Sequence, residues 1–311
     1  MHFLFIFVDG VGLGPDDPAS NPFASAKMPV LIELLGGKRM VQETLGMSKF
    51  VYETETVSLL GLDTTLGVTG RPQSASGQAA IISGKNIPKL IGEHFGPKPN
   101  PKIRSYLQQD NLFSELKEMG KVATLLNAFP QPYFDALKSG RRLPGAIAMA
   151  FLEAGIPLKT TEDLIEGQAI SADFTGEGWH TRLKITSAPI ISTAEAGKKL
   201  ARLACHYDFS FFEYWLTDYA GHRADIQGSC QLLESFDEML GGLVSEWNGT
   251  KGLILITSDH GNLEDVNSSR HTLNPVPALL IGDPILRKEF SQSLHNLTDI
   301  KPAILNLFRS D

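Results

Sequence analysis

Short apolar runs alternate with longer amphipathic stretches along this chain, and the alternation predicts an α/β fold. Apolar runs rich in aromatic and β-branched residues occupy residues 3–8, 122–127, 209–216, 252–257 and 276–281. Runs of this length are typical of strands buried on both faces of a parallel sheet. Segments with a helical pattern lie between them, at residues 28–37, 112–121, 144–155, 194–208 and 227–246.

Residues 128–190 break this pattern. They contain one plausible helix, at residues 144–155, and a possible strand at residues 167–174. We therefore predict a small inserted cap at residues 128–190 and a core made of residues 1–127 and 191–311. Two further segments are expected: a turn leading into a short helix of small residues at 70–86, and a surface loop at 87–103, which is rich in Pro, Gly and Lys.

Three of the apolar runs are followed within three residues by an aspartate: Asp9, Asp218 and Asp259. Because the carboxyl ends of parallel strands meet at one edge of a sheet, these carboxylates are expected to converge. Unpaired, they would repel one another and raise one another's pKa, so the arrangement favours bound cations.

Histidines accompany these aspartates. His222 follows Asp218 by four residues, which is one turn of helix or a strand-to-helix bend, and His260 follows Asp259 directly. His271 lies eleven residues after His260. Carboxylates together with imidazoles suit zinc or manganese, and six such side chains exceed the needs of one ion. The sequence thus predicts two divalent ions, which form the usual clamp for displacement at phosphorus.

The glycines of the first loop invite a different interpretation. Gly10, Gly12 and Gly14 form a GxGxG pattern, whereas a dinucleotide-binding turn has GxGxxG, and Pro15 and two aspartates follow. A tight turn beside a ligand-bearing strand end fits the pattern better.

A candidate nucleophile lies in the segment QSASGQ. A serine at the N-terminus of a helix faces free backbone donors, and a bound metal ion would activate its hydroxyl. Ser74 is our choice and Ser76 is its competitor, which spacing alone does not separate. Candidates for substrate contacts are Arg71, His94, Arg141 and Arg142.

Bulk properties narrow the class of protein. Hydrophobic residues make up 42% and charged residues 20% of the 311 residues, which predicts a globular enzyme-like body. The net charge of −7 argues against general nucleic-acid binding. The first apolar run is too short to span a membrane. Two cysteines, Cys205 and Cys230, without CxxC spacing favour a reducing cytoplasm. The oligomeric state cannot be predicted.

The motifs resemble, in order, the two-metal core of the alkaline phosphatase superfamily. They are VDGVG, QSASGQ, TDYAGH, SDHGN and RHTLNPVP. Cofactor-independent phosphoglycerate mutase and phosphopentomutase are the members that the chain most resembles. The resemblance implies a three-layer α/β sandwich and two ligand sets. One ion would be held by Asp9, Ser74, Asp259 and His260, and the other by Asp218, His222 and His271.

The resemblance also implies an activity. We expect a phosphatase or phosphomutase that acts on a small phosphorylated metabolite through a phosphoserine intermediate on Ser74. The chain departs from the phosphoglycerate mutases in three ways. Gln73 precedes the serine where they have an asparagine, and Gln78 stands where they have a histidine. The cap is also shorter, so their substrate-gripping arginines cannot be transferred. The alternative is a non-catalytic metal-binding or regulatory protein with the same fold.

Overall fold

A computed structural model describes residues 1–46, 51–247 and 249–310. Its centre is a seven-stranded sheet with strand order β2-β3-β7-β6-β1-β5-β4. The strands are β1 His2–Val8, β2 Val51–Glu53, β3 Val57–Leu62, β4 Ala123–Leu125, β5 Phe209–Tyr214, β6 Gly252–Thr257 and β7 Val276–Gly282.

The middle of the sheet is parallel. Strand β1 pairs in parallel with both β5 and β6, and β4 pairs in parallel with β5. Strand β7 is antiparallel to both β6 and β3, so β3 shares the direction of β6. Strand β2 is antiparallel to β3. The prediction of a mostly parallel sheet is confirmed.

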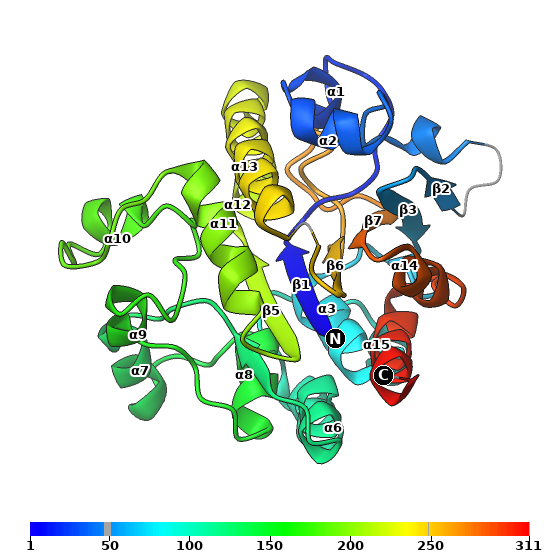
Figure 1. Cartoon of the computed structure of the whole chain (residues 1–311). Helices are drawn as coiled ribbons and strands as arrows, with labels where there is room; N and C mark the ends of the chain where they lie inside the picture. Colours follow the sequence, from blue (N-terminus) through cyan, green and yellow to red (C-terminus); the bar gives the residue numbers. More distant parts are fainter. Residues whose placement is uncertain (47–50, 248, 311) are drawn as a thin grey trace.

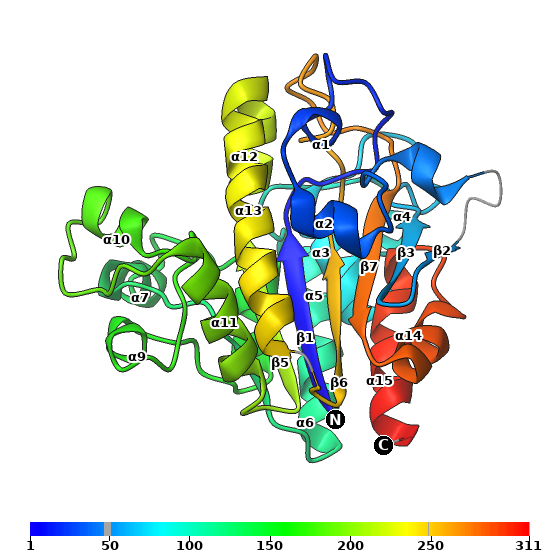
Figure 2. The ribbon, with the colours of Figure 1, turned by 45° about the horizontal axis from the view of Figure 1, so that its top comes forward.

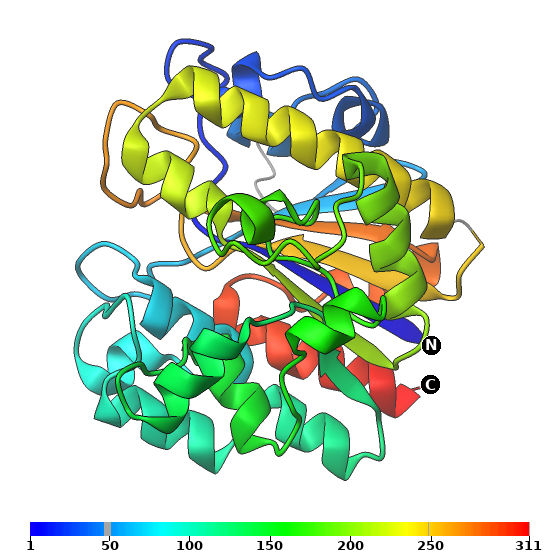
Figure 3. The same ribbon diagram turned by 90° about the vertical axis from the view of Figure 1, so that its left-hand side faces the viewer.

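Helices cover both faces of the sheet and make three layers (Figure 1 and Figure 3). One layer contains α1 Pro22–Ser25, α2 Pro29–Leu34, α11 Thr193–Ala204 and α13 Ile226–Trp247. The other contains α3 Ser74–Ser83, α5 Pro101–Gln109, α6 Leu112–Glu118, α8 Ala146–Glu153, α14 Pro284–Ser291 and α15 Ile300–Ser310.

Strand β1 shows why the core has two halves. Successive side chains of a strand point to opposite faces. Phe3, Phe5 and Phe7 accordingly pack into the cluster that includes α3 and α15, whereas Leu4 and Ile6 pack into the cluster that includes α11 and α13. A short run that is apolar on both faces therefore indicates a central strand.

Most predicted elements are present, with three corrections. Residues 87–103 are not one loop, because α4 spans Ile87–Ile91 and α5 begins at Pro101, each after an asparagine that caps the helix. Residues 131–138 form α7 (Gln131–Lys138) in a segment of irregular composition. The possible strand at 167–174 is reduced to an isolated bridge between Asn127 and Ile170.

The segment 128–190 has two kinds of surroundings. Helix α8 packs against α3, α5 and α6 in the main core. By contrast α9 Thr161–Ile165 and α10 Glu177–Thr181 share a small separate cluster, made of Ala128, Leu164, Ala169, Trp179 and Ala188. Figure 2 shows α9 and α10 at the side of the molecule, away from the central strands. The inserted cap remains a proposal, and the part around α9 and α10 is the best candidate for it.

None of the helices in the described residues has the length and apolar character needed to cross a membrane.

Candidate metal centre

The three predicted aspartates lie at the ends of adjacent strands. Asp9 directly follows β1, Asp259 lies two residues after β6, and Asp218 lies in the first turn of α12 (Leu216–Arg223), just after β5. The Thr217 hydroxyl donates to the Asp9 carbonyl oxygen at 2.6 Å and so ties α12 to the end of β1. Because β7 runs antiparallel, the loop that precedes it brings His271 to the same edge.

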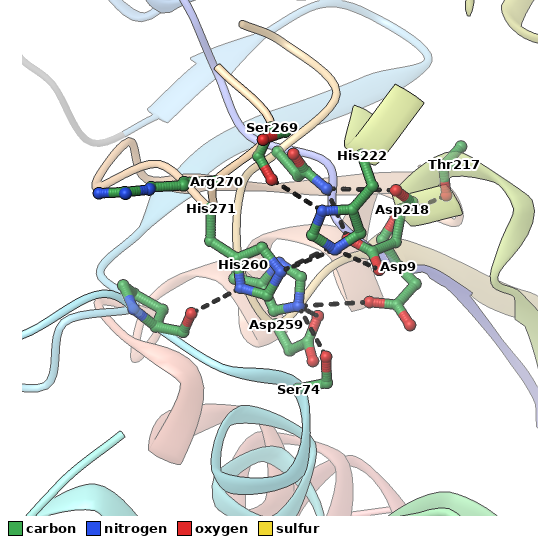
Figure 4. Close-up of polar contacts among 12 residues, drawn as sticks. Asp9, Ser74, Thr217, Asp218, His222, Asp259, His260, Ser269, Arg270 and His271 are labelled. Carbon is green, nitrogen blue, oxygen red and sulfur yellow. Dashed lines mark hydrogen bonds and ion pairs between the residues drawn. The ribbon is translucent and has the colours of Figure 1, made fainter. Parts of the chain in front are cut away.

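All seven predicted ligand side chains converge there (Figure 4). Ligand atoms of Asp9, Asp259 and His260 lie within 4.8 Å of one another, and so do those of Asp218, His260 and His271. His222 joins this second group, since its Nε2 lies 3.3 Å from His271 Nε2 and 3.4 Å from Asp218 Oδ2. The strand ends therefore form two adjoining groups of metal-type ligands.

The structure separates the two serine candidates. Ser74 is the first residue of α3, and its Oγ lies 3.0 Å from His260 Nε2. Ser76 is fully buried, and its Oγ accepts from the Phe95 amide while donating to the Gln73 carbonyl oxygen. Only Ser74 therefore presents its hydroxyl to the metal-type ligands.

Two of the histidines are oriented as metal ligands. His222 Nδ1 lies 2.8 Å from the Ser269 carbonyl oxygen, and His271 Nδ1 lies 2.8 Å from the Pro72 carbonyl oxygen. A carbonyl oxygen only accepts, so each Nδ1 carries the proton. Each Nε2 then turns its lone pair toward the cluster. A metal-bound histidine usually donates from its other ring nitrogen in this way.

Several buried polar atoms of the site have no hydrogen-bond partner among the described residues. They are Asp9 Oδ1, both carboxylate oxygens of Asp259, and His260 Nδ1. Buried polar groups are almost always paired, and an unpaired buried carboxylate is costly. Divalent cations among these oxygens and imidazole nitrogens would satisfy them, so the residues present fit bound metal ions.

The electrostatics of the site agree with this interpretation. Burial, reinforced by the negative charges of Asp259 and Asp218, raises the pKa of Asp9 well above its ordinary value. Burial and the charge of Asp218 likewise raise the pKa of Asp259. Burial lowers the pKa of His260 and of His271, which keeps both imidazoles neutral. Neutral imidazoles are the form that binds metals.

The first-loop glycines make room for acidic side chains. A Cβ atom at Gly10 would lie 2.8 Å from the Asp218 Cα, and one at Gly12 would lie 2.2 Å from Glu264 Oε1. A Cβ at Gly14 would also approach Glu264, at 2.9 Å. The GxGxG pattern therefore serves close packing around the metal-type ligands, as the tight-turn interpretation requires.

Glu264 is a residue that sequence reasoning missed. Its carboxylate is fully buried and accepts from the Gly12 and Asn262 amides, each at 2.8 Å, and from Asn274 Nδ2 at 3.1 Å. The Thr272 hydroxyl also donates to it. These donors lie in two loops, the one after β1 and the one between β6 and β7, close to Asp9, His260 and His271. Glu264 thus holds together the loops that carry the ligands.

Two other polar residues also escaped the sequence patterns. Asn262 Nδ2 donates to Asp218 Oδ1 at 2.7 Å and so orients this carboxylate. Glu213 pairs in register with Phe7, and burial raises its pKa to about 7. Its place after Phe209 and Phe211 on one face of β5 is the only local signal that it points toward the α3 side of the sheet.

The substrate-contact candidates divide into two pairs. Arg71 Nη1 donates to the His271 carbonyl oxygen, and His94 Nε2 lies 3.2 Å from the Val68 carbonyl oxygen. Both line one pocket near Ser74. Arg141 and Arg142 lie instead in the exposed loop after α7, where Arg141 contacts Ser139 and the Arg142 guanidinium stacks over the Tyr133 ring. The role of all four remains a prediction.

Comparisons with known proteins agree with this geometry. Residues 162–311 match the family model described as Metalloenzyme superfamily. The 2,3-bisphosphoglycerate-independent phosphoglycerate mutase of Desulforudis audaxviator (strain MP104C) is 33% identical over 107 residues, which are 32% of this chain and 21% of that protein. Its counterpart in Pyrococcus abyssi (strain GE5 / Orsay) is 26% identical over 302 residues, which are 88% of this chain and 68% of that protein.

Solved structures show the same fold. A protein from Pyrococcus horikoshii matches with a TM-score of 0.57 and 16% identity, over 100% of this chain and 97% of that chain. The alkaline phosphatase of the Antarctic bacterium TAB5 matches with a TM-score of 0.51 and 12% identity, over 99% of this chain and 97% of that chain.

Residues 162–311 thus match the Metalloenzyme superfamily, and the fold is shared with a solved alkaline phosphatase, in agreement with the resemblance that the motifs suggested. Phosphoglycerate mutases of the cofactor-independent type are among the relatives of the chain. The match to the Desulforudis audaxviator protein spans only 21% of that protein's length.

Proposed function

We propose that the chain transfers the phosphoryl group of a small phosphomonoester, with Ser74 as the nucleophile. The observation that carries this proposal is the position of the Ser74 hydroxyl. It lies at the N-terminus of α3, 3.0 Å from His260 Nε2. Close to it, Asp9 Oδ1, both carboxylate oxygens of Asp259 and His260 Nδ1 have no hydrogen-bond partner in the described residues. Relatives named as phosphoglycerate mutases and alkaline phosphatases support the same chemistry.

Two ligand sets are available for two divalent ions, manganese or zinc. Asp9, Ser74, Asp259 and His260 would hold one, and Asp218, His222 and His271 the other. When bound, such ions would activate the serine hydroxyl and neutralise charge that develops on the phosphoryl oxygens.

The residues of the chain supply the remaining steps. Ser74 Oγ attacks phosphorus, the new Oγ–P bond forms as the ester P–O bond of the substrate breaks, and the substrate oxygen leaves with a proton. The first two backbone N–H groups of α3, those of Ser74 and Ala75, would face the phosphoryl oxygens. In the second step a water molecule or a substrate hydroxyl attacks phosphorus and frees Ser74. Water makes the enzyme a phosphatase, and a substrate hydroxyl makes it a mutase.

The serine pair provides a direct test. With manganese or zinc present, we expect the protein to hydrolyse p-nitrophenyl phosphate and Ser74→Ala to lower kcat by at least about a thousandfold. Ser76→Ala is the matched control, because it removes the competing hydroxyl, and it should keep kcat within about tenfold. Mass spectrometry of the acid-quenched reaction should locate a phosphate on Ser74. Turnover that is indifferent to Ser74→Ala would contradict the mechanism, and absence of any turnover would favour the non-catalytic alternative.

A further inference from the structure

An open pocket of about 430 Å³ lies beside the nucleophile. Its walls come from two segments: residues 69–73, which lead into α3, and residues 93–96, which follow α4. The side chains and backbone that define it belong to Arg71, Gln73, Glu93, His94, Phe95 and Gly96. Its volume lies within the range of small-molecule sites.

The pocket is fixed to the start of α3. The Ser76 amide donates to the Phe95 carbonyl oxygen at 2.9 Å, and the Phe95 amide donates to Ser76 Oγ at 3.0 Å. A Cβ atom at Gly96 would lie 3.3 Å from the Ser74 amide nitrogen, so the second wall passes directly over the nucleophile's backbone. Arg71, by donating to the His271 carbonyl oxygen, anchors the first wall to the metal-type cluster. A phosphoryl group at Ser74 would therefore have the rest of its ester within reach of this pocket.

The walls offer donors and acceptors in a mixed set. Arg71 supplies the only positive charge among the described lining residues, and Glu93 supplies the only negative charge. Neither forms an ion pair within the described ranges 1–46, 51–247 and 249–310. His94 Nε2 donates to the Val68 carbonyl oxygen, which leaves His94 Nδ1 as an acceptor. Gln73 adds an amide that both donates and accepts.

We propose that this pocket binds the non-phosphoryl part of the substrate, and that this part is uncharged and carries several hydroxyl groups, as in a sugar or polyol monophosphate. The inference rests on the proposed phosphoryl transfer at Ser74. Each hydroxyl both donates and accepts, so it matches walls that offer donors on Arg71 and Gln73 and acceptors on Gln73, Glu93 and His94. A carboxylate in the same place would accept from Arg71 but would be repelled by Glu93. Glu93 is therefore the residue that selects against a second acidic group.

Two substrates of nearly equal size isolate this effect. Glycerol 3-phosphate and 3-phosphoglycerate differ in one group, a hydroxymethyl in the first and a carboxylate in the second. With the metal-loaded full chain, we expect kcat/KM to favour glycerol 3-phosphate by about tenfold or more. Glu93→Gln should reduce this preference about three- to tenfold, chiefly by raising kcat/KM for phosphoglycerate, because it removes one like charge at a partly solvated site.

The control is Glu118→Gln, which makes the same change of charge at the exposed end of α6. That end precedes β4 and so lies at the opposite edge of the sheet from Ser74. The Glu118→Gln variant should therefore leave the preference for glycerol 3-phosphate unchanged.

The outcomes separate this inference from the function beneath it. A preference for phosphoglycerate, or a preference that Glu93→Gln does not change, overturns the inference while Ser74-dependent hydrolysis of p-nitrophenyl phosphate still stands. If no Ser74-dependent transfer occurs with either substrate or with p-nitrophenyl phosphate, the proposed function fails and this inference fails with it.

Discussion

Asp259 shows how a single residue can be costly for folding and useful for ligand binding. Its side chain is fully buried and neither carboxylate oxygen has a hydrogen-bond partner in the described structure. Burial and the nearby charge of Asp218 raise its pKa, so that the metal-free protein favours the neutral acid. A divalent cation reverses this preference, because it stabilises the ionised form.

Asp259→Asn tests this balance through the pH dependence of stability. Because the folded-state pKa of Asp259 lies above its unfolded value, its contribution to stability is complete below the unfolded pKa. It is lost as pH rises, at about 1.4 kcal/mol per pH unit until the folded pKa is reached. The metal-free variant lacks this loss, so its Tm should exceed that of the wild type by an amount that grows as pH rises above the unfolded pKa toward the raised folded pKa.

Thermal melts of both proteins in chelator at several pH values provide the measurement. Contributions from His260 and His271 are common to both proteins and largely cancel in the difference. Saturating manganese should reverse the order, because the variant lacks an anionic ligand. A metal-free variant that is less stable than the wild type at every pH would contradict this account.

At the residue scale, the sequence pointed to the candidate ligands but not to the residues that support them. Asp9, Asp218 and Asp259 could be predicted because each follows an apolar run, and the histidines because they come shortly afterwards. Glu264 could not, because what gives it its role is contact with the distant first loop, through the Gly12 amide. Ser74 and Ser76 differ in their hydrogen-bond partners, which are His260 for Ser74 and backbone groups of Gln73 and Phe95 for Ser76. No local sequence pattern predicts these partners.

At the scale of elements, the ligand geometry depends on close packing between loops and helices. A Cβ atom at Gly77 would lie 2.9 Å from the Asp259 Cβ, so this glycine lets α3 approach the end of β6 and brings Ser74 to the site. A Cβ at Gly221 would similarly lie 2.7 Å from the Asn262 side chain, where α12 meets the loop after β6. Short glycine contacts therefore set the distances between the ligand-bearing elements.

Glu264→Gln should weaken metal binding without removing a ligand. Four donors share the two carboxylate oxygens, and an amide would turn an NH₂ group toward two of them. The loops that carry Asp9, His260 and His271 would then lose their common anchor. We expect manganese affinity, measured by calorimetry, to fall about 10- to 100-fold.

Asp237→Asn is the matched control for this change. Asp237 is also buried, and it accepts from the Val30 and Leu31 amides where α13 meets α2, away from the metal-type cluster. It should lower Tm yet leave manganese affinity within about twofold. Equal losses of affinity in both variants would mean that Glu264 contributes only general stability.

Secondary structure was predictable where periodicity is strong and local. The central strands are apolar on both faces, and the two long helices α11 and α13 have clear amphipathic patterns. By contrast α4 and α7 are short helices in Pro-rich segments. Asn86 caps the start of α4, and Pro130 precedes the first turn of α7. The expected strand at 167–174 fails because Ile170 finds only Asn127 as a bridge partner.

At the scale of the whole molecule, sheet order explains why distant segments meet. Strands β6, β1 and β5 are neighbours in the sheet although they come from residues 252–257, 2–8 and 209–214. Their carboxyl ends form one edge, and the antiparallel β7 starts at that edge, which adds His271. Strand order is not a local property, so the sequence alone suggested convergence only through the rule for parallel sheets and the family resemblance.

Anomalous diffraction from crystals of the manganese-loaded protein would test the central claim most directly. The account predicts two neighbouring manganese peaks per chain, separated by about 4 Å. One peak should contact Asp9, Ser74, Asp259 and His260, and the other Asp218, His222 and His271. Peaks elsewhere in the molecule, or no ordered ion in this cluster at saturating manganese, would contradict it.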